Sequence, residues 1–430
     1  MVISNTTQDR IFELESRLED TRLKIHDLAT MGTLISSILD IETILSVVME
    51  MSIRTVAGEV GLIQLHENGE LKSKVTWGVD DNLIRNILYK DDQDISTYCY
   101  RHQESLIFDD FDFKLEYGPQ INSILAVPIK SRARCHGTVT IINKSCGDVF
   151  TAEDKRNLEI LINFAAVAID NSILIEASLQ KQKIEQELAI ARQVQETILP
   201  EGKIEFKGVD IGTLYLPAKA VGGDFYDVIA LDDEAFVMVI GDVSNKGVPA
   251  AMVMSAATAI IKSEMRNNPT IMISELIGNL NNILCDGIIK SHGMFVTLFI
   301  ARLDFRNRTI GYCNAGHVPP LYWDTTGNQI VELRTGGTFV GQFPDIRYEE
   351  GSQSMGRGDR LFAFTDGLTE AEDIHQGFFG IDRVKQVFLS EKELPADKFC
   401  ERVKEWADRF REGAGNDTVD DFTLFQINIM

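Results

Sequence analysis

Apolar residues near the start of the chain recur at alternating intervals of three and four positions. Such spacing gathers them on one stripe of a helix and is the pattern of a coiled coil. It predicts a helix over residues 8–36, and we assign residues 1–39 to an N-terminal coiled-coil segment. The stripe could pack on its own domain, but its heavily charged flanks favour pairing with a second copy. Its positions are Ile11, Leu14, Leu18, Thr21, Ile25, Leu28 and Ile35, with Gly32 at the remaining one.

Residues 40–175 alternate between helical and strand patterns, which predicts a self-contained α+β domain. A helical signal begins near Thr151, where Thr-Ala-Glu-Asp is a favourable N-terminal sequence. The other predicted helices cover 41–56, 83–88 and 95–101, and the predicted strands cover 60–65, 71–76, 123–128 and 137–143.

The pattern over residues 156–200 predicts one long helix that leaves this domain and becomes a connector at 176–204. Pro200 ends it, because proline cannot continue a helix. Most of the connector is polar, so burial within one domain is not expected, and pairing with a second copy is the economical arrangement. Its apolar stripe runs through Ile184, Leu188, Ala191 and Ile198, with Gln195 on the same seam.

Residues 205–430 form the third segment, with strands and helices in separate blocks. Such blocks indicate an α+β fold with mostly antiparallel sheets, and two sheets with helices outside would bury the apolar strands. Strands are predicted at 209–216, 223–230, 235–242, 294–303, 309–314, 359–364 and 421–428, and helices at 249–265, 272–290, 383–388 and 396–411.

Composition and charge narrow the class of protein. The chain has 430 residues, enough for two or three domains, and a net charge of −23. This charge disfavours nucleic acid and anionic membrane surfaces as partners. The sequence shows no signal-peptide pattern, and we expect no apolar stretch long enough to cross a bilayer. The six cysteines lack metal-type spacing, which is consistent with a cytoplasmic protein whose thiols are reduced.

Four short acidic segments in the last half of the chain carry the candidate chemistry. Each puts an aspartate beside glycine or another aspartate at the end of an apolar run. Carboxylates at strand ends from distant segments can converge on hard divalent cations, and oxygen ligands suit Mg²⁺ or Mn²⁺. Taken singly, each segment would be an ordinary acidic turn; together they favour a metal site. They are Gly222-Gly223-Asp224-Phe225-Tyr226-Asp227, Gly241-Asp242-Val243-Ser244-Asn245-Lys246-Gly247, Thr365-Asp366-Gly367 and Asp420-Asp421-Phe422-Thr423.

The order of motifs in residues 40–175 resembles a GAF domain, a family of ligand or signal sensors that often dimerise. The motifs are Leu125-Ala126-Val127-Pro128-Ile129, Gly137-Thr138-Val139-Thr140-Ile141-Ile142-Asn143 and Phe150-Thr151-Ala152-Glu153-Asp154. Asn143, Lys144, Phe150 and Asp154 partly match the motif of cyclic-nucleotide-binding members, with Lys155 where that motif has Glu. These positions also fix a turn and a helix start in members that bind no nucleotide, so we assign no ligand or signal.

The acidic segments, with Asn314-Ala315-Gly316-His317 between them, occur in the order of the metal-dependent PPM serine/threonine phosphatases. They look most like the bacterial branch of RsbU and SpoIIE, as does Ala191-Arg192-Gln193-Val194-Gln195 before Leu199-Pro200. The resemblance spans 205–430 and implies a β-sandwich flanked by helices. It also implies two Mn²⁺ or Mg²⁺ ions, and a phosphorylated STAS-type anti-anti-sigma factor in a stress-response pathway as substrate.

Carried over position by position, the resemblance gives each ligand a role. Asp242 would bridge the two ions, with the backbone carbonyl of Val243 on one of them. Asp224 would help to hold one ion, and Asp366 and Asp420 the other. A water between two such ions can attack phosphorus in line.

Several neighbours of these ligands have less defined roles. Asn245 stands where the family usually has glycine; asparagine tolerates left-handed backbone, so the loop is expected to keep its shape. Asp227 and Asp421 are expected at most to support the ligands or bind water. His317 could act as a general acid or be structural.

Other activities fit the sequence less well. None of the six cysteines has the arginine six residues later that a cysteine-based phosphatase needs, and the P-loop pattern is absent. Gly222-Gly223-Asp224-Phe225 partly resembles a diguanylate cyclase signature but lacks its second acidic residue before the phenylalanine. The alternative function that stays open is a catalytically weak or inactive phosphatase-like regulator that binds a phosphoprotein.

Overall fold

The computed structural model describes residues 32–35, 37–78, 95–109, 121–200, 202–289, 293–413 and 420–430, with a few single positions before residue 31. The chain forms two compact units, Met1–Lys183 and Ile184–Met430. Most of the predicted helix at 8–36 and all of that at 83–88 lie outside the described residues.

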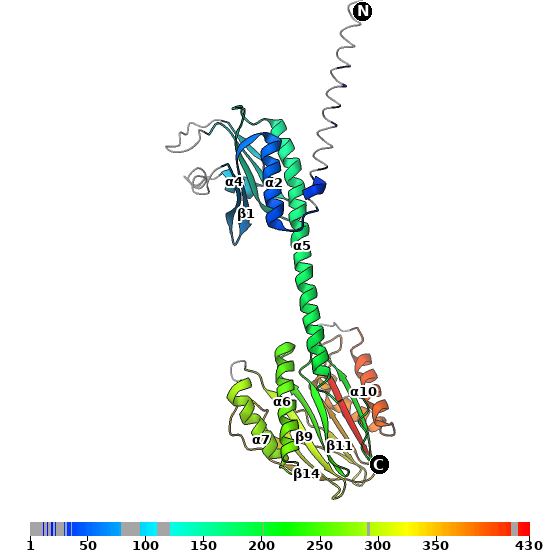
Figure 1. Cartoon of the computed structure of the whole chain (residues 1–430). Coiled ribbons are helices and arrows are strands. Elements are labelled where there is room, and N and C mark those ends of the chain that lie inside the picture. The colour runs from blue at the N-terminus through cyan, green and yellow to red at the C-terminus, as the bar shows by residue number, and fades with distance from the viewer. Residues whose placement is uncertain are drawn as a thin grey trace, which may run out of the picture. The chain divides into compact units, whose positions relative to one another are not determined.

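The first unit is a five-stranded antiparallel sheet with helices on both faces (Figure 1). The strands lie in the order β2-β1-β5-β4-β3, and α2 and α5 share one hydrophobic core with β1, β4 and β5. The helices are α2 (Ile41–Val56), α4 (Ile95–His102) and α5 (Ala152–Glu196). The strands are β1 (Gly58–Glu67), β2 (Glu70–Trp77), β3 (Leu106–Phe108), β4 (Ile124–Lys130) and β5 (Cys135–Lys144).

Local sequence explains where these helices begin. The Asp40 carboxylate accepts the backbone N–H of Thr43 at 2.8 Å, which caps α2. At α5, Asp154 Oδ2 accepts the N–H of Thr151 at 2.8 Å, and Thr151 Oγ1 accepts the N–H of Asp154 at 3.2 Å. This reciprocal pair is a capping box. It confirms the helix start expected at this position.

The residues that partly match a cyclic-nucleotide motif have structural partners here. Asn143 Oδ1 accepts the N–H of Asn122 at 2.8 Å, and Lys144 pairs with Asp154 at 2.9 Å. The first contact joins β5 to the segment before β4, and the second joins the end of β5 to the start of α5, so both contacts are structural.

One 18-residue window of α5 has a mean hydropathy of 1.8, so this helix could span a membrane by length and composition alone. Our expectation that no stretch would approach this requirement was therefore wrong. Of that window, 44% is buried inside the structure. Leu158, Leu161, Ile162 and Ile169 of α5 lie in the core of the first unit, so packing against the sheet accounts for the apolar composition.

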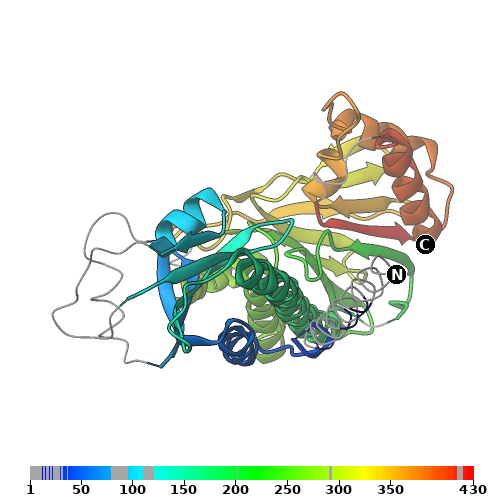
Figure 2. The same cartoon turned by 90° about the horizontal axis from the view of Figure 1, so that it is seen from above.

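The second unit is a sandwich of two sheets with helices outside, as predicted (Figure 2). One sheet has the order β13-β10-β9-β8-β7, with β14 also paired to β10; the other has the order β12-β11-β15-β16-β6. Apart from the parallel β10–β13 pair, the ladders in the described residues are antiparallel. The strands of the first sheet are β7 (Phe225–Asp232), β8 (Ala235–Val243), β9 (Val296–Asp304), β10 (Thr309–Ala315), β13 (Gly336–Gly337) and β14 (Gly351–Ser354).

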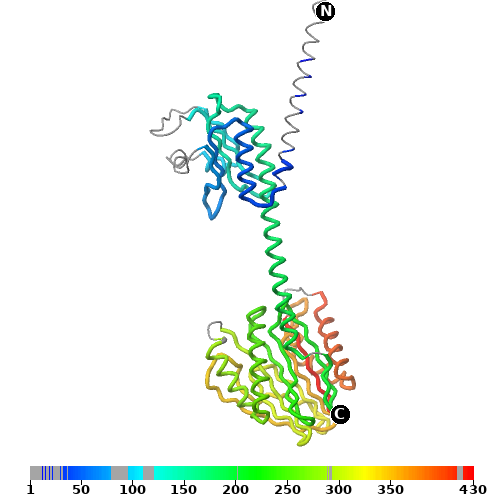
Figure 3. Tube along the Cα trace, in the orientation of Figure 1, coloured from blue at the N-terminus to red at the C-terminus, as the bar shows by residue number. Residues whose placement is uncertain are grey.

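The second sheet consists of β6 (Val209–Leu216), β11 (Leu321–Asp324), β12 (Gln329–Glu332), β15 (Arg360–Phe364) and β16 (Phe422–Ile429). The closing strand β16 lies between β15 and β6, which brings the end of the chain beside residues more than 200 positions earlier (Figure 3). The sequence pattern had not predicted β11 to β14, which are only two to four residues long.

Helices cover the outer faces of the sandwich. α6 (Val248–Asn267) and α7 (Ile273–Ile283) pack against the first sheet, and α9 (Gly380–Ser390) and α10 (Ala396–Phe410) pack against the second (Figure 1). The helix predicted at 272–290 ends earlier as regular α-helix, because Leu284–Ile288 form a π-helical turn. A short helix, α8 (Asp366–Thr369), follows β15.

Candidate metal centre

The four candidate aspartates lie at strand ends of both sheets. In one sheet, Asp224 directly precedes β7 and Asp242 is the second-last residue of β8. Asp366 follows β15 and Asp420 precedes β16, in the other sheet. Asp242 is close enough to Asp224, Asp366 and Asp420 for each to affect its pKa. The fold thus brings together four carboxylates that are up to 196 positions apart in sequence.

Burial and mutual repulsion raise the pKa values of Asp224, Asp242 and Asp366. Burial, followed by the charge of Asp366, raises the pKa of Asp242 to about 7. Burial and then Asp420 raise the pKa of Asp366 to about 6. Burial and then Asp242 raise the pKa of Asp224 well above its ordinary value. Acidic groups that are buried together in this way resist ionisation unless a cation neutralises them.

Asp224 is the most enclosed of the four, with 1% of its surface exposed. The hydroxyls of Thr365 and Thr423 each donate to its Oδ2 at 2.6 Å. Its Oδ1 is buried and has no hydrogen-bond partner among the described residues. A buried carboxylate oxygen without a donor is costly, and a bound cation would offset that cost.

The backbone beside Asp224 is packed against the segment that carries Asp242. A Cβ added at Gly223 would lie 2.8 Å from the carbonyl oxygen of Val243, so only glycine permits this approach. The Val243 carbonyl therefore lies at the loop that carries Asp224. Its part in the metal site stays a prediction.

Asp420 is held by a cation of the protein itself. Lys246 Nζ lies 2.9 Å from Asp420 Oδ1, and both side chains are about one-third exposed. As the side chains lie, no group of three or more His, Cys, Asp or Glu residues within the described part of the chain is spaced to hold a metal ion. The buried, mutually repelling carboxylates and the unpaired Asp224 oxygen nonetheless have the donor chemistry of a hard-cation site.

Asp421 and Asp227, the two acidic neighbours, have structural partners. Asp421 accepts the N–H of Ala218 at 2.7 Å and that of Gly223 at 2.6 Å, so it fixes the loop before Asp224. Asp227 is buried and lies 3.0 Å from Lys262 Nζ. Both residues thus support the site from outside.

Two further sequence expectations concern Asn245 and His317. Asn245 has a φ of 72°, so asparagine does adopt the left-handed conformation of this loop. His317 is 4% exposed, and burial lowers its pKa to about 4. Its Nδ1 lies 3.1 Å from Thr297 Oγ1. The enclosure and the lowered pKa of this imidazole favour the structural role over that of a general acid.

The end of α5 is joined directly to the candidate site. Gln195 is buried, its Nε2 donates to the Gly222 carbonyl at 2.6 Å, and its Oε1 accepts the Gly222 N–H at 3.2 Å. The same Nε2 lies 3.9 Å from Met254 Sδ of α6. The sequence predicts Gln195 on a seam between two copies; it packs inside its own unit instead, because its amide pairs with the backbone of Gly222.

The sequence did not reveal the part that several residues play in the site. They are Thr365 and Thr423, which donate to Asp224, Lys246, which pairs with Asp420, and Gly222, which pairs with Gln195. The threonines lie inside or beside the acidic motifs, and this adjacency was the one available signal. Their direction toward Asp224 depends on the pairing of β15 with β16, which the sequence does not reveal.

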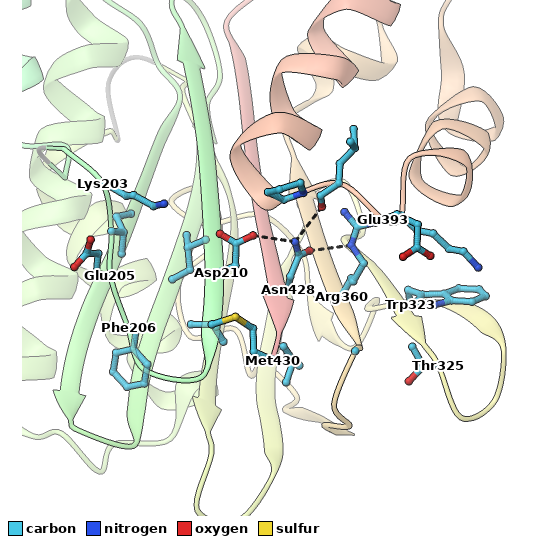
Figure 4. Close-up of a pocket in the computed structure, with 18 residues that line it drawn as sticks. Lys203, Glu205, Phe206, Asp210, Trp323, Thr325, Arg360, Glu393, Asn428 and Met430 are labelled. Atoms are coloured by element: carbon cyan, nitrogen blue, oxygen red, sulfur yellow. Dashed lines mark hydrogen bonds between the residues drawn. The ribbon is translucent and has the colours of Figure 1, made fainter.

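A pocket of about 720 Å³ lies at the other end of the same sheet, where β15 begins and β16 ends (Figure 4). There Asn428 accepts from Arg360 Nε at 2.8 Å and donates to Asp210 at 3.2 Å. Asn428 thus links a buried guanidinium to a carboxylate. None of the four candidate aspartates lines this pocket.

Comparison with known proteins assigns both units to families. Residues 40–169 match the GAF domain family, and residues 232–429 match the family of stage II sporulation protein E. Phosphoserine phosphatase RsbU of Bacillus subtilis is 32% identical over 246 residues, which cover 57% of this chain and 70% of RsbU. Phosphoserine phosphatase RsbP of the same species is 26% identical, over 44% of this chain and 47% of RsbP.

A solved structure supports the fold of the second unit. The SiaA-PP2C domain of Pseudomonas aeruginosa matches with a TM-score of 0.51 and 20% identity, over 58% of this chain and 99% of that domain. The predicted α+β architecture, with a GAF domain and a sandwich of the PP2C type, is thereby confirmed.

Proposed function

Because the chain belongs to the family of RsbU-like serine phosphatases with a SpoIIE domain, we propose that it hydrolyses phosphoserine or phosphothreonine on a regulatory protein under the control of its GAF domain. The observation that carries this proposal is the convergence of Asp224, Asp242, Asp366 and Asp420 from both sheets. The two relatives that are named phosphoserine phosphatases support serine chemistry.

In this proposal two Mn²⁺ or Mg²⁺ ions would be held by the four aspartates and the Val243 carbonyl, and they would supply a water activated near neutral pH and neutralise the phosphoryl group. Residues of the protein hold the proposed ligand side chains in position. Asp242 lies near carboxylates of both sheets, which supports its proposed role as the bridging ligand. Asp421 holds the loop of Asp224 in position, and Lys246 holds Asp420.

The substrate that we propose is a phosphorylated STAS-type anti-anti-sigma protein, as the family resemblance implies. The test incubates the purified chain with such a phosphoprotein and follows loss of phosphoserine on a phosphate-affinity gel. We expect turnover with added Mn²⁺ or Mg²⁺ and none after chelation. Activity that survives exhaustive EDTA would exclude the metal-dependent mechanism.

The alternative, a regulator without turnover, makes a different prediction for the same mixture. It would bind the phosphoprotein without releasing phosphate, and Asp242→Asn would leave that behaviour unchanged. Phosphate release that is lost in Asp242→Asn supports the enzyme.

We further propose that the end of α5 regulates the site. Gln195 hydrogen-bonds to Gly222, which lies two residues before Asp224. Lys262 of α6 donates to the Ile198 carbonyl at 3.1 Å and also pairs with Asp227. A change in the connector could thus reach Asp224 through Gly222, or α6 through Met254 and Lys262. The two arrangements need differ by only a few kcal/mol to act as a switch.

Dimerisation through helices is the accompanying proposal. The connector part of α5 is mostly polar, but it carries apolar side chains that are more than half exposed. They are Ile184, Ile190 and Val194. A second copy would cover this surface. In this scheme an unidentified signal at the GAF domain changes the pairing of the helices.

A further inference from the structure

Two threonine side chains converge on one oxygen of Asp224. Thr365 follows β15 and Thr423 lies in β16, and both hydroxyl oxygens are 2.6 Å from Asp224 Oδ2. Thr365 is 0% exposed and Thr423 is 1% exposed, so neither hydroxyl has water as an alternative partner. Both hydroxyls therefore donate to Asp224.

Backbone contacts define the direction of these hydrogen bonds. The Thr423 N–H donates to Thr365 Oγ1 at 3.1 Å, and the Thr365 N–H donates to the Thr423 carbonyl at 3.1 Å. Because Thr365 Oγ1 accepts a backbone N–H, its own hydrogen is available to Asp224. Thr423 Oγ1 likewise can donate to that carboxylate. Both donors thus point at Oδ2, and they are held by the ladder between two strands.

The consequence is an asymmetric carboxylate. Oδ2 receives two hydrogen bonds, whereas the buried Oδ1 has no partner among the described residues. Rotation of the carboxyl group would break both hydrogen bonds, and these become charge-assisted, a stronger kind, when a bound cation keeps Asp224 ionised. Asp224 is therefore fixed with a single oxygen available to a ligand.

We propose that Thr365 and Thr423 are positioning residues that orient Asp224, present its Oδ1 to the metal centre and thereby set the affinity of that centre for its cation. The proposal rests on the proposed function, in which Asp224 is a metal ligand. Neither threonine contacts the substrate or the reacting atoms. Groups that hold a metal ligand from outside typically change metal affinity by about 10- to 100-fold when they are removed.

The same two segments also carry ligands of their own. Thr365 directly precedes Asp366, and Thr423 lies three residues after Asp420. Asp224 belongs to the opposite sheet, at the start of β7. The threonine pair thus links the two sheets of the sandwich, because it joins the segments of Asp366 and Asp420 in one sheet to Asp224 in the other.

The test measures Mn²⁺ binding to the full chain by isothermal titration calorimetry, with no substrate present. Thr365→Val and Thr423→Val keep the shape of the side chain and remove its hydroxyl, whereas Thr365→Ser and Thr423→Ser keep the hydroxyl. Thr213→Val is the matched control, because Thr213 lies in β6 of the same sheet and its hydroxyl faces Tyr226 at 3.4 Å.

We expect each valine variant to bind Mn²⁺ about tenfold more weakly or worse, while both serine variants and Thr213→Val stay near the wild-type affinity. Valine variants that are folded and bind Mn²⁺ like the wild type would overturn the inference. If the valine variants do not fold, Thr365→Cys and Thr423→Cys replace them, since a thiol is of similar size and donates only weakly. Weaker Mn²⁺ binding by the cysteine variants would then support the inference, and wild-type binding would overturn it.

Asp242→Asn in the same titration separates failure of the proposed metal centre from failure of the proposed positioning role. If the wild type binds Mn²⁺ and Asp242→Asn does not, the metal centre stands and the threonine variants decide the inference alone. If the wild type binds no more Mn²⁺ than Asp242→Asn, the proposed metal centre fails, and the positioning role fails with it.

Discussion

Replacing Asp242 by asparagine is expected to stabilise the metal-free protein, although it removes a proposed metal ligand. The physical reason is that Asp242 is buried, and the nearby charges of Asp366 and Asp420 further oppose its ionisation. Asparagine has nearly the same shape and no charge. Without a cation, the substitution therefore removes repulsion and a desolvation cost while it preserves the packing.

The size of the effect follows from the pKa of Asp242. That pKa is about 7 in the folded protein, against an ordinary value of 3.8. At 1.36 kcal/mol per pKa unit, the ionised carboxylate destabilises the fold by about 4 kcal/mol at most. The sign follows from proton linkage: the folded state holds this proton more tightly than the unfolded state. Wild-type stability is thus lost as the pH rises from about 4 through about 7, and the asparagine variant escapes that loss.

The assay is urea unfolding in EDTA at pH 5 and at pH 8. A Trp77→Phe background leaves Trp323 and Trp406 as fluorescent probes, and both lie in the second unit. The gain of Asp242→Asn in free energy of unfolding should be larger at pH 8 than at pH 5. An exposed control in the β7–β8 turn, Asp233→Asn, should change stability by less than about 0.5 kcal/mol.

Adding Mn²⁺ at pH 8 should reverse the order of stabilities. The wild type gains free energy because the ion binds only the folded state, whereas Asp242→Asn loses the bridging ligand and gains little. The reasoning is refuted if Asp242→Asn is less stable than the wild type in EDTA at pH 8. A gain of equal size at both pH values would refute it as well, since the effect would then not come from ionisation.

Three further predictions test the site and its control. Asp242→Asn should lower phosphatase turnover by about a hundredfold or more, whereas Asp227→Asn, whose partners are Lys262 and the Val228 N–H, should have a small effect; equal losses in two folded variants would show that the ligand assignment is wrong. Light scattering at micromolar concentration should give the mass of a dimer, and a monomer would contradict pairing through the helices. Insertions of one, two, three, four and seven residues near Gln186 should alter regulation, with seven restoring it because a heptad returns the coiled-coil phase; indifference to insertion length would make the connector a passive tether.

The sequence by itself determined the elements whose signals are local. The start of α5 followed from Thr151 and Asp154, which are three residues apart and bond to each other. The apolar runs before Asp242 and Asp366 predicted strands over 235–242 and 359–364, and β8 and β15 end within one residue of those limits, at Val243 and Phe364. Period, capping and turn chemistry act over a few residues, so they can be read before the chain is folded.

Tertiary structure alone decided which distant groups meet. Thr365 and Thr423 share Asp224 only because β15 pairs with β16 and both face β7 across the sandwich. Gln195 lies on the predicted helical stripe, yet its amide is buried against Gly222, 27 residues later in the chain. The short strands β11 to β14 exist through their partners, since so few residues carry no periodicity. Strand pairing and burial are long-range, and a hydroxyl or amide acquires its role from whichever unpaired polar group the fold places beside it.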